Sequence, residues 1–275
     1  MTPTTAIGKM AKSSLTMRGW RNVYGGRRLA LAMARPPETI TLPARGWRID
    51  RRKALIAAAG LWAGFALMTW LVIAGRTGRF DHSGLLYWRT GVGLAPKGPR
   101  FLLETVRDLT SLGGVLLRNL VAIGAVAALL FLRLRREAVL LALTVAGAWI
   151  VEGLLKGLVG RPRPVIVPHL TQAAGASFPS GHAFNSAVVY IAIALAFATL
   201  SARQSVRLTI IGVAVVLSLA IAWTRVWLGV HFPSDVTAGW VGGAGWAFLA
   251  AALLQRPAAA AAESETAEKL DPTVH

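Results

Sequence analysis

Six stretches of this chain are long and apolar enough to cross a lipid bilayer as helices. The hydrocarbon core of a bilayer takes about 20 residues of α-helix. The stretches that reach this length approximately are residues 54–74, 112–132, 138–158, 183–200, 206–223 and 236–254. Only 15% of the residues are charged, against about 25% in soluble domains, so much of the surface must face lipid. We expect an all-α integral membrane protein with six transmembrane helices in a bundle.

The basic residues gather in front of the first apolar stretch. The net charge is +18, and 12 of the 30 Lys and Arg residues precede residue 54. A basic flank beside a membrane span is typical of a cytoplasmic segment or of contact with anionic lipid, so no nucleic acid is expected as a partner. We divide the chain into a poorly ordered basic segment (1–52), a six-span domain (53–255) and a disordered tail (256–275). Met17 and Met33 are alternative starts, which leaves open whether residues 1–32 belong to the native product.

Three polar clusters interrupt the apolar pattern. They are KGLVGRPRP at residues 156–164, PSGH at 179–182 and TRVWLGVHFPSD at 224–235. The first follows the third span, the second precedes the fourth, and the third joins the fifth and sixth. Because successive spans alternate in direction, all three clusters are expected on one face of the membrane. Each alone could be a turn, an interfacial histidine or a snorkelling flank, but their coincidence on one face favours a functional site.

The clusters carry more cations than the nearby acids can neutralise. Lys156, Arg163 and Arg225 are three such cations, and Glu152 is placed to pair with Lys156 one helical turn away. Cations beside lipid are costly unless they meet an anion, and the guanidinium group fits phosphate geometry. Gly181 has no side chain, so the backbone at this position can approach a ligand closely. The helix expected to begin near His182 would add free N–H groups and the positive end of its dipole. The combination predicts an anion site.

Two histidines add reactive groups to this anion site. His231 and Asp235 are four residues apart, close enough for the carboxylate to hold one imidazole nitrogen and leave the other free. An oriented imidazole is a nucleophile or a general base, and His182 could then protonate the leaving oxygen. The chain has no cysteine, and no cluster with the spacing of metal ligands is visible in it. The residues therefore predict phosphoester cleavage without a metal.

The three clusters together resemble the signature of the type 2 phosphatidic acid phosphatase superfamily, K-x6-RP, PSGH and SR-x5-H-x3-D. The one departure is Thr224 in place of serine, which keeps the hydroxyl. The resemblance implies that five residues bind phosphate: Lys156, Arg163, Ser180, Gly181 and Arg225. It also implies that His231 attacks phosphorus to give a phosphohistidine, that Asp235 orients His231, and that His182 protonates the leaving group.

The expected function is that of a membrane phosphatase acting on a lipid phosphate or pyrophosphate. Phosphatidic acid, phosphatidylglycerol phosphate and an isoprenoid pyrophosphate are candidate substrates, membrane lipids are the expected surroundings, and neither a cofactor nor a metal is expected. One alternative is a phosphotransferase that uses the same site with an acceptor other than water. Others are an anion transporter and a phospholipid-binding protein without activity. The sequence leaves the oligomeric state open.

Three further expectations concern the loop after the first span, a cation within the second span and the orientation of the chain in the membrane. Residues 76–110 are predicted to form short helices in the membrane interface that help to admit a lipid headgroup. Arg118, near the start of the second span, is expected to snorkel to the interface. The basic flank at residues 45–53 places the N-terminus in the cytoplasm, so that the three clusters would face the periplasm from a bacterial inner membrane.

Overall fold

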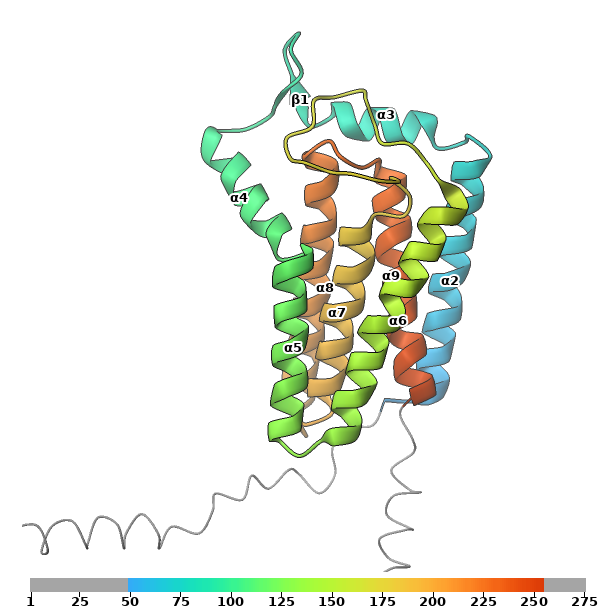
Figure 1. Cartoon of the computed structure of the whole chain (residues 1–275), viewed down its shortest axis with the longest axis vertical. Coiled ribbons are helices and arrows are strands. Elements are labelled where there is room, and N and C mark those ends of the chain that lie inside the picture. Colours follow the sequence, from blue (N-terminus) through green and yellow to red (C-terminus); the bar gives the residue numbers. More distant parts are fainter. Residues whose placement is uncertain (1–48, 255–275) are drawn as a thin grey trace, which may run out of the picture. The chain divides into compact units, whose positions relative to one another are not determined.

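The computed structural model describes residues 49–254, and the secondary structure of that part is almost entirely helical (Figure 1). The expectations for residues 1–48 and 255–275 lie outside the described residues. One two-stranded hairpin, β1 (Arg89–Thr90) and β2 (Ala95–Pro96), accompanies the helices. The helices are α2 (Arg51–Ile73), α3 (Gly78–Leu86), α4 (Arg100–Ser111), α5 (Val115–Phe131), α6 (Arg135–Val159), α7 (Gly181–Ala198), α8 (Gln204–Trp227) and α9 (Pro233–Leu254).

The membrane-spanning character expected from the sequence is confirmed for these helices. Five of them, α2, α6, α7, α8 and α9, are long and apolar enough to cross a bilayer by themselves. The remaining expected span, residues 112–132, coincides with α5, which qualifies as a span only together with α4, and the two helices meet at a bend of 47°. The expected boundary at residue 112 therefore falls at the bend between two helices. The number of spans is five, or six with the bent pair.

The centre of the bundle is α7, which contacts α5, α6, α8 and α9 (Figure 1). Of the 18-residue apolar stretch of α7, 67% is buried inside the bundle. The corresponding share for α2 is 11%, so α2 faces outward over most of its length. Helix α9 lies very close to α7 at two glycines. A Cβ added to Gly239 would lie only 2.7 Å from the carbonyl oxygen of Ser180, and a Cβ added to Gly243 would collide with the backbone of Phe184. The absence of side chains at Gly239 and Gly243 therefore allows α9 and α7 to pack closely.

The connections that carry the polar clusters lie at one end of the bundle. Helix α3, the hairpin, α4, the loop at residues 160–180 and the α8–α9 connection gather there, while the α5–α6 and α7–α8 connections lie at the other end (Figure 1). Helix α6 ends at this face because Gly160 takes a left-handed conformation (φ 58°) as its C-cap, and the following Arg-Pro-Arg-Pro cannot continue a helix. The chain then runs extended across the end of the bundle before α7 begins.

The segment between α2 and α5 forms short helices, as expected, and it packs directly on the bundle. Leu85 of α3 is fully buried in one apolar cluster with Val167, Val226 and Val236. Trp88 stacks edge to face on Trp223 of α8, with ring centroids 5.2 Å apart. This segment is therefore part of the wall around the polar end of the bundle.

Candidate active site

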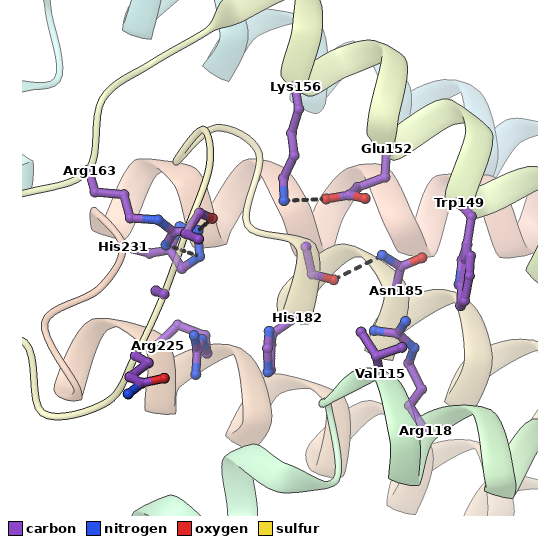
Figure 2. Close-up of a pocket in the computed structure, with 14 residues that line it drawn as sticks. Val115, Arg118, Trp149, Glu152, Lys156, Arg163, His182, Asn185, Arg225 and His231 are labelled. Atoms are coloured by element: carbon purple, nitrogen blue, oxygen red, sulfur yellow. Dashed lines mark hydrogen bonds and ion pairs between the residues drawn. The ribbon is translucent and has the colours of Figure 1, made fainter.

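The three polar clusters meet around one cavity of about 430 Å³ at this end of the bundle (Figure 2). Six of the eight predicted site residues line it: Lys156, Arg163, Gly181, His182, Arg225 and His231. The other two, Ser180 and Asp235, are fully buried and are not among its lining residues. The volume falls in the range of ligand sites, about 300–1,000 Å³.

His231 is held with one ring nitrogen toward the protein core and the other beside a cation. Its Nε2 atom is 3.1 Å from Nη1 of Arg163. Because a guanidinium can only donate, Nε2 must accept, and the ring proton then resides on Nδ1. Burial, together with nearby Arg225 and Arg163, lowers the pKa of His231 to about 4, although Asp235 opposes this shift. The imidazole is therefore neutral at neutral pH, with the lone pair on Nε2.

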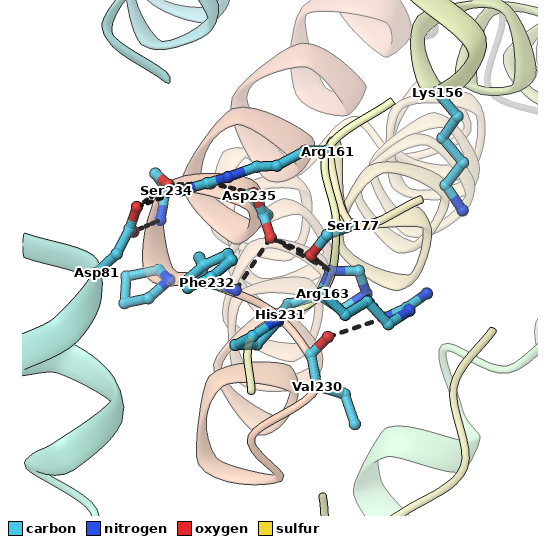
Figure 3. A network of polar contacts seen from close by, with 12 residues as sticks. Asp81, Lys156, Arg161, Arg163, Ser177, Val230, His231, Phe232, Ser234 and Asp235 are labelled. Atoms are coloured by element: carbon cyan, nitrogen blue, oxygen red, sulfur yellow. Dashed lines mark hydrogen bonds and ion pairs between the residues drawn. The ribbon is translucent and has the colours of Figure 1, made fainter. Parts of the chain in front are cut away.

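Ser177 links His231 to Asp235, as Figure 3 shows. The Ser177 hydroxyl donates to Oδ2 of Asp235 at 2.5 Å and lies 3.3 Å from Nδ1 of His231. The direct distance from Nδ1 to Oδ2 is 3.6 Å, longer than an ordinary hydrogen bond. Since the serine proton points to the carboxylate, its oxygen is free to accept from Nδ1–H. The orientation of His231 thus depends on both Ser177 and Asp235.

Asp235 is itself fixed by Arg161, which follows the C-cap of α6. Nη1 of Arg161 donates to Oδ1 of Asp235 at 2.5 Å and to the hydroxyl of Ser234 at 2.8 Å. Nη2 of Arg161 donates to Asp81 of α3 at 2.8 Å. The Asp235 carboxylate also accepts from the backbone N–H of Phe232 at 3.0 Å. A buried carboxylate needs such partners to remain ionised.

Arg163 is anchored by the loop that crosses the end of the bundle. Its guanidinium donates to the carbonyl oxygens of Ala174, Gly175 and Val230 at 2.7–3.1 Å. Burial lowers the pKa of Arg163 somewhat, and the charge of Asp235 opposes that shift. The three carbonyls therefore aim a cation at Nε2 of His231 without neutralising its charge.

Lys156 forms the ion pair with Glu152 that the sequence suggested, with Nζ and Oε1 2.7 Å apart. This pair lies against the start of α7. A Cβ on Gly181 would come within 2.6 Å of Oε1 and 3.2 Å of Nζ. A larger residue would push the ends of these two side chains aside, so the glycine of PSGH lets the ion pair lie directly against the start of α7.

Arg225 reaches the cavity from the last turn of α8. It is 3% exposed, and its Nη1 donates to the hydroxyl of Thr110 at 2.9 Å. Thr110 belongs to α4, which places the bend between α4 and α5 beside the site. Thr224, the residue that departs from the expected serine, is buried and donates its hydroxyl to the carbonyl of Ile221.

The first turn of α7 supplies backbone donors to the same cavity. Ser180 is the N-cap, and its hydroxyl makes no capping hydrogen bond. Gly181 and His182, which follow, line the cavity. Their N–H groups belong to the first turn of a helix, which has no carbonyl partners within the helix. The start of α7 can thus bind an anion.

Comparison with known proteins agrees with this geometry. The sequence profile of the PAP2 superfamily matches residues 137–258. The phosphatidylglycerophosphatase B of Bacillus subtilis is 35% identical over 145 residues, which cover 50% of this chain and 68% of that protein. The chain belongs to the PAP2 superfamily.

A second relative and one solved structure are also similar to this chain. The lipid A 1-phosphatase of Rhizobium johnstonii is 34% identical over 122 residues, which cover 41% of this chain and 46% of that protein. The crystal structure of a transmembrane PAP2-type phosphatidylglycerolphosphate phosphatase from Bacillus subtilis superposes with a TM-score of 0.63 at 24% identity. The superposed region covers 78% of this chain and 98% of the Bacillus subtilis phosphatase chain. At this identity the structural likeness establishes the fold alone.

Sequence reasoning missed several residues of this PAP2 site. Ser177 and Arg161 stand within or beside the motifs, but their spacing does not reveal that they contact Asp235. Asp81 is far away in the sequence and carries no motif. The expectation for Arg118 is wrong: instead of snorkelling outward, its side chain is 3% exposed and lines the cavity. Only the packing of α5 against α6 and α7 reveals this orientation.

Proposed function

We propose that this PAP2 protein is a membrane phosphatase that hydrolyses a lipid phosphate or pyrophosphate through a phosphohistidine. The observation that carries the proposal is the state of His231, whose Nδ1 is held by Ser177 and Asp235 and whose Nε2 carries a lone pair next to Arg163. The names of the relatives, a phosphatidylglycerophosphatase and lipid A 1-phosphatases, favour a lipid substrate. Residues 53–255 would form the phosphatase domain.

In the first step a phosphate monoester enters the cavity and meets Lys156, Arg163, Arg225 and the N–H groups at the start of α7. The phosphate oxygens draw the donor of Arg163 away from Nε2 of His231. That nitrogen then attacks phosphorus, and the bond from phosphorus to the ester oxygen breaks. The proton on Nδ1 stays with the imidazolium, which Asp235 stabilises through Ser177. The arginines stabilise the charge on the equatorial oxygens.

The leaving oxygen takes its proton from His182, which we propose as the general acid. In the second step a water attacks the phosphohistidine on the side that the leaving group has vacated. His182 is now neutral and accepts the proton of that water. The bond from phosphorus to Nε2 breaks, inorganic phosphate leaves, and both histidines return to their starting states.

A phosphotransferase would follow the same first step and differ only in the acceptor. An anion transporter would need polar residues along a path through the bundle. Here one cavity, at one end of the described bundle, is lined by four cations: Arg118, Lys156, Arg163 and Arg225 (Figure 2). This distribution favours a surface reaction over transport.

Release of phosphate by the purified full-length protein tests the proposal. Phosphatidic acid, phosphatidylglycerol phosphate and a prenyl pyrophosphate should be compared, with and without an added alcohol that would reveal phosphotransfer.

Covalent labelling tests the intermediate. When a reaction with radiolabelled substrate is quenched in base, which preserves phosphohistidine, the wild-type protein should carry the label. His231→Ala should neither turn over nor be labelled. His82→Ala, which removes an exposed histidine of α3, is the control and should behave as the wild type. Wild-type activity in His231→Ala would contradict the mechanism.

A further inference from the structure

Arg118 is a buried cation in the cavity that the proposed reaction does not use. It lies one turn into α5, outside the three polar clusters, and is 3% exposed. Its Nη1 donates to the carbonyl of Gly113 at 3.0 Å, and the guanidinium lies 5.9 Å from the ring centre of Trp149. Its Nε is buried and makes no hydrogen bond within residues 49–254. A buried donor without a partner calls for an explanation, such as a missing ligand.

Asn185 adds an independent observation on the same wall of the cavity. It lies one turn after His182 on α7 and is 4% exposed. Its Nδ2 donates to the carbonyl of Gly181 at 3.1 Å, which fixes the amide orientation. Its Oδ1 is buried and has no hydrogen-bond partner in the described part of the chain. Both Arg118 and Asn185 line the cavity, so two unsatisfied polar groups share one space.

His182 separates these two residues from the proposed nucleophile. In Figure 2, His182 lies between the pair formed by Arg163 and His231 on one side and Arg118 with Asn185 on the other. Gly113 confirms that Arg118 and His182 are close neighbours. Its carbonyl binds Arg118, and a Cβ on it would lie 3.3 Å from Cδ2 of His182. Since His182 would protonate the leaving oxygen, Arg118 is placed where the leaving group departs.

The charge of the cavity exceeds what a single phosphate can neutralise. Its lining holds four cations, Arg118, Lys156, Arg163 and Arg225, and one carboxylate, Glu152. Without the two histidines the net charge is three positive, and the proton that His182 carries as the proposed general acid adds a fourth. A phosphate monoester brings about two negative charges near neutral pH. A substrate with a second phosphate would match the cavity more closely.

We infer that Arg118 forms a second phosphate subsite that binds a phosphate within the leaving group. This inference rests on the proposed function, because it takes His182 as the group that faces the leaving oxygen. In a lipid pyrophosphate, His231 bonds to the terminal phosphorus and the bond to the bridging oxygen breaks. The electron pair stays on the leaving lipid monophosphate, and the proton of His182 goes to that bridging oxygen. Arg118 stabilises the charge that this phosphate gains, and Oδ1 of Asn185 accepts from its new O–H group.

The subsite predicts a preference for lipids with two phosphates over lipids with one. In a pyrophosphate the second phosphate is bonded directly through oxygen, and in phosphatidylglycerol phosphate it follows a glycerol unit. Phosphatidic acid has no second phosphate and leaves Arg118 unpaired. One hydrogen bond to a charged group corresponds to about a 10- to 100-fold difference in affinity.

Binding of non-hydrolysable analogues tests the subsite independently of turnover. A prenyl methylenediphosphonate and the matching prenyl monophosphonate should be titrated into the full-length protein in nanodiscs. We expect the diphosphonate to bind at least about tenfold more tightly to the wild type. Arg118→Gln should abolish this ratio, and Arg118→Lys, which keeps the charge, should restore part of it. Arg135→Gln is the matched control, because Arg135 is exposed and begins α6, about 25 Å along the helix from Glu152.

Hydrolysis of the three lipids then separates the two sources of the second phosphate. Arg118→Gln should lower kcat/KM about 10- to 100-fold for a pyrophosphate, a glycerol-spaced substrate or both, and change that for phosphatidic acid less than threefold. Equal affinity of the wild type for the two phosphonates, or an unchanged ratio in folded Arg118→Gln, would overturn the subsite even if phosphate release is intact. A preserved preference without any phosphate release would instead overturn the proposed function.

Discussion

The carboxylate of Asp81 accepts two hydrogen bonds from Ser234, one from its backbone N–H at 2.9 Å and one from its hydroxyl at 2.8 Å. The two residues are 153 positions apart, in α3 and in the first turn of α9. Figure 3 shows that Asp81 also binds Arg161, which in turn binds Asp235. The short helix between the first two spans thereby holds the carboxylate that positions the proposed nucleophile.

Asp81→Asn tests this connection. An amide cannot balance the charge of Arg161, so Asp235 and His231 should be held less firmly. We expect kcat to fall about 10- to 100-fold, because small displacements of a reactive group are costly, while KM changes little. Asp108→Asn, which alters an exposed residue of α4, should leave both constants unchanged. A rise in KM at constant kcat would show that Asp81 acts on substrate binding instead.

Ser177→Ala tests the bridge between His231 and Asp235. The substitution removes the hydroxyl that donates to Asp235 and lies 3.3 Å from Nδ1 of His231. A hydrogen bond to a charged group contributes about 1.5–3 kcal/mol, so kcat should fall roughly 10- to 100-fold. Ser205→Ala, at an exposed position of α8, is the control. If Ser177→Ala keeps full activity, Asp235 alone suffices to orient the ring.

The pH profile should report the lowered pKa of His231. The ring must be neutral to attack, and burial lowers its pKa to about 4. Activity should therefore persist as the pH falls below 6.5 and be lost only as it falls through about 4. Because the charge of Arg163 helps to lower this pKa, Arg163→Gln should move the acid limb of kcat/KM to higher pH. Ionisation of the substrate is the same for both proteins, so a limb that does not move belongs to the substrate.

Chelation tests the role of the cations in charge stabilisation. Lys156, Arg163 and Arg225 line the cavity with His231 and can stabilise the developing charge as a metal would. Phosphate release should therefore continue in EDTA, while vanadate, which resembles phosphate, should inhibit it competitively. Complete loss of activity in EDTA that Mg²⁺ restores would contradict this prediction.

Cysteine labelling tests the orientation, since the chain has no cysteine of its own. The positive-inside rule places the basic flank of α2 in the cytoplasm, which puts the cavity outside. Val165→Cys, at a fully exposed position of the α6–α7 loop, should react with an impermeant maleimide in spheroplasts. Ser205→Cys, at the opposite end of the bundle, should react only after lysis. The reverse pattern would place the active site in the cytoplasm.

The span assignments depend on local composition, and for that reason the sequence predicts them well. A helix in lipid needs an unbroken apolar surface, which can be counted along the chain. Alternation of the spans then brings the three polar clusters to one face. The expected spans fall on five helices and on α5, the second helix of the bent pair. The bend itself was missed, because α4 is polar and α5 is slightly shorter than a full span.

The supporting contacts of the site were decided by the tertiary structure alone. Arg118 looks like a flank residue in the sequence, but packing of α5 turns it into the cavity. Asp81 belongs to no motif, and it reaches Ser234 only because α3 folds back over the start of α9. Motifs and hydropathy record whether a residue meets lipid, water or a ligand. Which buried charge pairs with which depends on how distant helices pack, because a charge inside the bundle must find its partner wherever the fold provides one.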